Sequence, residues 1–77
     1  MCINENEIKT DFGNAIRKVR TQKDYSQERL AEISGLHRTY ISEVERGDRN
    51  ISLVNIIKLC KALDISLSQL SKIIEEE

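Results

Sequence analysis

The stretch SQERLAEISGLHRTYISEVERG, which runs from Ser26 to Gly47, predicts two short helices separated by a tight turn. Ser26 belongs to the residue types that best cap a helix N-terminus. Gly35 can adopt the left-handed backbone that ends a helix abruptly. Apolar side chains recur at helical spacing on both sides of this glycine, and Gly47 closes the stretch. We therefore expect helices over residues 27–34 and 37–46.

Two helices of this length around a glycine turn form a helix-turn-helix unit, and the residue types suit its geometry. Ala31 is small where the two helices must cross closely, while Leu36, Ile41 and Val44 hold the second helix against the rest of the domain. In such units the start of the second helix enters the major groove of DNA and meets base edges. The side chains left to point outward are His37, Arg38, Thr39, Tyr40 and Glu43.

Helical periodicity continues on both sides of this unit and predicts helices over residues 5–23, 52–63 and 66–75. The chain has no proline and only three glycines, which favours helices over a sheet with many turns. Its 77 residues suffice for one small core. We expect a single all-α domain of five helices over residues 1–77, with residues 52–76 also serving dimerisation.

Several kinds of site find no support in the sequence. The two cysteines and the single histidine offer no spacing typical of a disulfide framework or a metal site, so we expect Cys60 in the core and Cys2 to be inert. No nucleophile–base pair or phosphate-binding glycine loop indicates an enzyme, a cofactor or a small-molecule ligand. No apolar run is long enough for a membrane helix and no signal peptide is visible, so we expect a cytoplasmic location.

The distribution of charge is more informative than its sum. The net charge is −1, yet all six arginines lie between Arg17 and Arg49. Arginine presents a planar fork of donors that suits phosphates and guanine edges. Such segregation within a nearly neutral chain is typical of a protein that binds DNA with one face. Charge alone leaves a second interpretation open, a solvated helical surface of mixed charge.

The run GLHRTYISEVERGDRNIS, residues 35–52, resembles the controller proteins of restriction–modification systems. These proteins fall within the wider helix-turn-helix family of lambda repressor and Cro. The resemblance extends over almost the whole chain. It implies a five-helix homodimer that binds palindromic operators near its own promoter and controls a restriction endonuclease gene. In that family, such proteins activate transcription from one operator and repress it when a second is filled.

The residues leave other functions open. A phage-type repressor or an antitoxin-like autoregulator would bind DNA in the same way. A protein-interaction module with this fold would not bind DNA, because fold alone does not decide function. The exposed face formed by Arg38, Thr39 and Tyr40 argues against the last alternative.

The resemblance also implies individual contacts. It places Arg38 and Thr39 at base-reading positions, with Tyr40 beside them and Arg49 near bases or backbone. Positions that match phosphate contacts are Arg17, Gln27, Asn50 and Ser52. Two further candidates for DNA contact are His37 and Glu43, of which Glu43 could accept a hydrogen bond from cytosine N4. Glu45 and Arg46 are expected to be structural.

The last third of the chain offers more apolar surface than a domain of this size can easily bury, with eleven large aliphatic residues from Leu53 to Ile74. The surplus predicts an isologous dimer patch. We expect Leu67, Leu70 and Ile74 to contribute to it, together with part of the helix predicted over residues 52–63. Two-fold symmetry would then set the two recognition helices about 34 Å apart. Activation would also need a contact for RNA polymerase, for which Glu43 and Asp48 are candidates.

Overall fold

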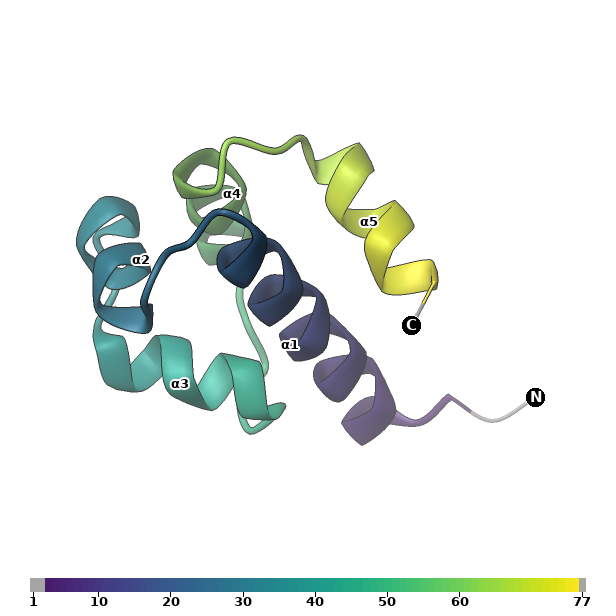
Figure 1. The fold of residues 1–77 in the computed structure, drawn as a ribbon. Helices are drawn as coiled ribbons and strands as arrows, with labels where there is room; N and C mark the ends of the chain where they lie inside the picture. Colours follow the sequence, from purple (N-terminus) through teal and green to yellow (C-terminus); the bar gives the residue numbers. More distant parts are fainter. Residues whose placement is uncertain (1–2, 77) are drawn as a thin grey trace.

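Five α-helices make up the described part of the chain, residues 3–76 of the computed structural model (Figure 1). They are α1 (Glu5–Gln22), α2 (Gln27–Ser34), α3 (Arg38–Arg46), α4 (Leu53–Ala62) and α5 (Leu67–Glu75). No strand occurs in residues 3–76, which confirms the expected all-α class. Each predicted helix end lies within one residue of the observed end. Cys2 and the expectation attached to it lie outside the described residues.

Local capping explains why the helix ends were predictable. The hydroxyls of Ser26, Ser52 and Ser66 each accept a backbone N–H from the first turn of the helix that follows. Gly35 and Gly47 end α2 and α3 at φ angles of 74° and 80°, in the left-handed region that glycine tolerates best. Helix α3 begins one residue later than predicted. His37 has an extended backbone and is the N-cap of this helix.

The core forms where α1 passes between α3 and α5 (Figure 1). Each of the five helices contributes a fully buried aliphatic side chain: Ile16, Leu30, Ile41, Leu59 and Leu70. Leu63, the C-cap of α4, is fully buried as well. Cys60 is 4% exposed, which confirms its predicted place in the core, and burial raises the pKa of its thiol. Ala31 is buried as well, as its small size at a helix crossing predicted.

A glycine sets the distance between α1 and α3. A Cβ atom at Gly13 would lie 2.4 Å from the carbonyl oxygen of Val44, closer than real Cβ atoms come to any neighbour. The backbones of the two helices therefore touch at this point. This close contact fixes the second helix of the helix-turn-helix unit against α1.

Burial corrects one predicted interface residue. Leu70 is 0% exposed and belongs to the core, because α5 packs along α1 and turns this side chain inward. It is therefore not available to a partner chain. Leu67 is 45% exposed and Ile74 is half-buried, so these two side chains stay accessible.

Part of α4 was also expected in the dimer interface, and the most exposed aliphatic side chains of α4 and α5 lie at the start of α4. Leu53 is 68% exposed and Val54 is 65% exposed.

None of the described helices combines the length and the apolar character that a membrane crossing requires. Within residues 3–76, no three His, Cys, Asp or Glu side chains are grouped so that they could hold a metal ion.

Candidate nucleic-acid interface

Residues predicted to contact DNA bases are exposed to solvent at the start of α3. His37, Arg38 and Thr39 are exposed, whereas Ile41 and Val44 on the opposite side are buried. This division follows from helical geometry, since residues three and four apart share a face. The exposed side chains and the buried anchors therefore fall on the faces that the sequence predicted.

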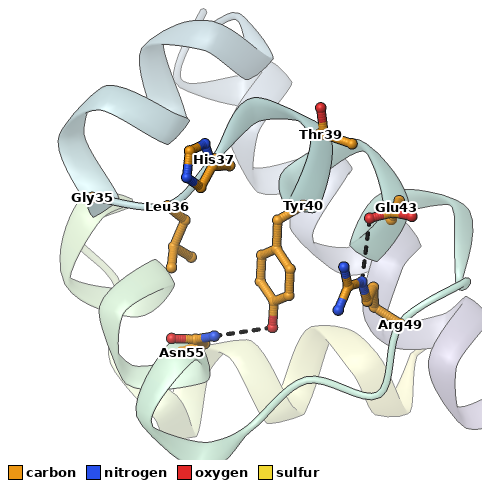
Figure 2. A pocket seen from close by; sticks show the side chains of 8 residues that line it. All are labelled: Gly35, Leu36, His37, Thr39, Tyr40, Glu43, Arg49 and Asn55. Carbon is orange, nitrogen blue, oxygen red and sulfur yellow. Dashed lines mark hydrogen bonds and ion pairs between the residues drawn. The ribbon is translucent and has the colours of Figure 1, made fainter.

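An open hollow of about 370 Å³ lies beside these residues, between α3, the loop after it and α4 (Figure 2). The structure thus brings together five predicted contact residues that come from two separate stretches of sequence. The side chains and backbone that line it are Gly35, Leu36, His37, Thr39, Tyr40, Glu43, Arg49 and Asn55.

Tyr40 occupies the middle of this hollow. Figure 2 shows it reaching from α3 towards α4, where its hydroxyl accepts a hydrogen bond from Nδ2 of Asn55 over 3.0 Å. The guanidinium of Arg49 lies over the ring, 5.1 Å from its centroid, within the range of a cation–π contact. Asn55 was not among the predicted site residues, although a lone amide in the apolar run of α4 indicates a polar partner.

Glu43 and Arg49 form an ion pair on the same face. Nε of Arg49 lies 3.2 Å from Oε1 of Glu43, and the two side chains are 50% and 30% exposed. The contact of Glu43 with a base stays a prediction, and in this structure its carboxylate is paired with Arg49. Arg49 is held at the rim of the hollow instead of extending freely into solvent (Figure 2).

Arg38 has only a loose partner. Its Nε lies 3.8 Å from Oε1 of Glu28, and the two side chains are 64% and 77% exposed. Exposed pairs of this kind contribute about 0–1 kcal/mol. The guanidinium of Arg38 is therefore only weakly held by Glu28.

At the opposite end of α3, the buried carboxylate of Glu45 binds side chains from two other helices. The side chain of Glu45 is 0% exposed and accepts two hydrogen bonds from Arg20, at 2.6 and 3.0 Å. It also accepts one from Nε2 of Gln27 over 3.0 Å, and Nε of Arg17 lies 3.6 Å away. Glu45 is thus structural, as predicted, and its partners include two side chains predicted to contact phosphates.

Arg17 and Gln27 both keep polar groups that have no hydrogen-bond partner among the described residues. Arg17 is 51% exposed at its side chain. Gln27 uses one of its two amide hydrogens on Glu45, which leaves the other hydrogen and its carbonyl oxygen. The remaining predicted phosphate contacts, Asn50 and Ser52, lie exposed in the loop between α3 and α4. Arg46, also predicted to be structural, pairs with Asp48 at 3.0 Å on the exposed surface.

Comparison with known proteins agrees with this arrangement. Residues 16–70 match the helix-turn-helix family. The chain is 49% identical over 73 residues to Control protein C.MunI of a Mycoplasma species, covering 94% of this chain and 99% of that protein. It is 52% identical over 61 residues to Control protein C.BamHI of Bacillus amyloliquefaciens, covering 78% and 75% of the two chains.

Solved structures show the same likeness. The restriction-modification controller protein C.AhdI from Aeromonas hydrophila superposes with a TM-score of 0.79 at 55% identity, over 80% of this chain and 94% of that one. The controller protein C.Esp1396I, crystallised as a tetramer in complex with its natural 35 base-pair operator, gives a TM-score of 0.85 at 32% identity, over 90% and 91% of the chains.

Proposed function

The chain belongs to the helix-turn-helix family, among the restriction–modification controller proteins, and we propose that it regulates its own gene and an endonuclease gene from shared operators. It is a DNA-binding transcriptional regulator. We propose that it acts by binding alone, in the cytoplasm, with no catalytic step. Occupation of one operator would activate transcription, and occupation of a second would repress it.

The observation that carries this proposal is the exposed start of α3 beside the hollow. Arg38 and Thr39 are the side chains we assign to base edges in the major groove, with Tyr40 and Arg49 next to them. Arg38 is exposed and only loosely paired, so its fork is available for a guanine. A surface that served only protein contacts would not need this concentration of donors.

Phosphate contacts would set the register of the protein on DNA. We assign this role to Arg17 and Gln27 on one side and to Asn50 and Ser52 in the loop on the other. Glu45 supports the first pair, since its buried carboxylate lies 3.0 Å from the Gln27 amide and 3.6 Å from Arg17. Rigid support of this kind reduces the entropy that the side chains lose on binding.

We propose that the protein binds its operator as a homodimer. Leu53 and Val54 at the start of α4 give an accessible apolar surface, and Leu67 and Ile74 remain candidates on α5. A two-fold axis through such a patch would present two copies of α3 to half-sites about one helical turn apart. Dimers on neighbouring operators could then form a tetramer like the one crystallised for C.Esp1396I.

Activation would add RNA polymerase as a partner. Asp48 is exposed after α3 and remains a candidate contact, although it pairs with Arg46 in this structure. Glu43 is a weaker candidate for this contact because its carboxylate holds Arg49.

A reporter experiment tests this regulatory role. The DNA upstream of the protein's own gene is fused to a reporter, and the protein is supplied from a separate, titratable promoter. We expect reporter activity to rise at low protein levels and to fall at high levels. A reporter whose activity never changes, together with the absence of a footprint on that DNA, would contradict the proposal.

A further inference from the structure

We infer that Glu43 determines specificity without reading a base, by positioning Arg49 for one. This inference rests on the proposed function, because it assumes that the α3 face reads DNA. An acidic side chain on such a face opposes binding to every phosphate backbone it approaches. Glu43 nevertheless lines the hollow next to Arg49 and Tyr40. Glu43 can therefore lower the affinity for all DNA and still raise the preference for one sequence over another.

The geometry limits how Arg49 can meet DNA. Glu43 accepts the Nε–H of Arg49 over 3.2 Å. Within residues 3–76, the two terminal nitrogens of Arg49 donate to no other side chain or backbone group, so that end of the guanidinium stays open (Figure 2). A guanidinium held at Nε presents its terminal pair of nitrogens in one direction. This is the arrangement that a bidentate contact with a guanine edge requires.

A second contact restrains the position of the Arg49 guanidinium. The ring of Tyr40 lies under Arg49, 5.1 Å from its Cζ atom, and the Tyr40 hydroxyl is tied to Asn55 of α4. Arg49 itself lies in the loop after α3, where the backbone alone would leave its long side chain several rotamers. Glu43 and Tyr40 together select one of them.

Loss of the Glu43 carboxylate would raise the affinity for unrelated DNA and weaken the contact of Arg49 with its base. Without Glu43, Arg49 can turn to phosphates of any sequence, and the local repulsion of DNA disappears. Affinity for unrelated DNA should therefore rise. The contact with one base should weaken, because ordering the free Arg49 side chain now costs entropy. The ratio of specific to non-specific affinity should fall.

The experiment measures that ratio by fluorescence anisotropy. The probes are a consensus duplex obtained by selection from random DNA and a scrambled duplex of the same composition. Glu43→Ala is compared with Asp48→Ala, which also removes one acidic side chain. The partner of Asp48 is Arg46 and not Arg49. Circular dichroism verifies that both variants are folded.

We expect Glu43→Ala to bind the scrambled duplex more tightly than wild type and to lose roughly five- to tenfold in discrimination, because the Arg49 contact is weakened and not removed; complete loss of a bidentate base contact can cost about a hundredfold. Asp48→Ala should shift both duplexes by a similar factor and keep the wild-type ratio. In an Arg49→Ala background, adding Glu43→Ala should leave the ratio unchanged, because the residue through which Glu43 acts is gone.

Two results would overturn the inference. Equal shifts of both duplexes in Glu43→Ala would show that the carboxylate only repels DNA. A loss of discrimination that persists in the Arg49→Ala background would show that Glu43 acts by a route of its own, such as a direct contact with cytosine. Absence of discrimination in the wild-type protein would instead contradict the proposed function on which the inference rests.

Discussion

The guanidinium of Arg20 donates Nε–H to Oε2 of Glu45 over 2.6 Å and so joins α1 to the last turn of α3. The carboxylate is fully buried, and its second oxygen accepts from Arg20 and from Gln27 of α2. One side chain therefore connects three helices, including both members of the helix-turn-helix unit. A buried charge is tolerable here because every part of it is hydrogen-bonded.

Glu45→Ala should destabilise the fold strongly, because it leaves the largely buried guanidinium of Arg20 without its partner. Breaking a buried pair from one side costs about 3–5 kcal/mol, which approaches the total stability of a small domain. The measurement is urea unfolding followed by circular dichroism. Arg46→Ala, which breaks the exposed pair with Asp48, should change the free energy of unfolding by less than about 1 kcal/mol. Equal losses in the two variants would refute the structural role of Glu45.

Gly13→Ala should also destabilise the protein, because the added methyl group would collide with the carbonyl oxygen of Val44. Helix α1 would have to move away from α3, at a cost of about 1–3 kcal/mol typical of overpacking. Asn14→Ala, at the next and exposed position of the same helix, is the control. Thermal unfolding compares them. If Gly13→Ala proved as stable as wild type, the close contact between the two helices would be wrong.

Arg17→Ala should weaken binding to all duplexes by a similar factor, because we assign Arg17 to the phosphate backbone. The slope of log affinity against log salt should fall by about 1. Arg29→Ala serves as control, since Arg29 is similarly exposed on α2, pairs with Glu32 and has no assigned DNA contact. A change confined to one operator sequence would instead place Arg17 on a base.

The proposed dimer surface, which contains Val54 but not the buried Leu70, predicts opposite outcomes for two substitutions to glutamate. Val54→Glu introduces a charge on an exposed apolar surface and should give a folded monomer. Leu70→Glu buries a charge in the core and should unfold the chain. Sedimentation equilibrium and circular dichroism distinguish the two results. A Val54→Glu protein that stays dimeric at micromolar concentration would exclude this part of α4 from the interface.

Most of the fold could be predicted because its signals are local. Serine caps and two left-handed glycines mark the helix ends within a few residues of sequence, and apolar periodicity gives each helix its buried face. Partners distant in sequence could not be predicted in this way. The bond between Arg20 and Glu45 spans 25 residues, and nothing local links Tyr40 to Asn55.

In the candidate site, too, features with local signals could be predicted and contacts between distant residues could not. The residues that face outward on α3 follow from the buried positions of Ile41 and Val44. The role of Leu70 was predicted wrongly because periodicity identifies the apolar face of α5 without saying which part of it α1 covers. The ion pair of Glu43 with Arg49 depends on the path of the loop after α3, which the sequence pattern does not define.

Selection of bound duplexes from random DNA, run on wild type and on Arg38→Ala, tests the DNA-reading role most directly. We expect wild type to enrich a two-fold-related consensus with half-sites about one helical turn apart. Arg38→Ala should lose preference at one position of each half-site, worth about 1–3 kcal/mol of discrimination, and keep the rest. Failure of wild type to enrich any consensus, with only weak and salt-sensitive retention of DNA, would contradict a dimeric sequence-specific regulator.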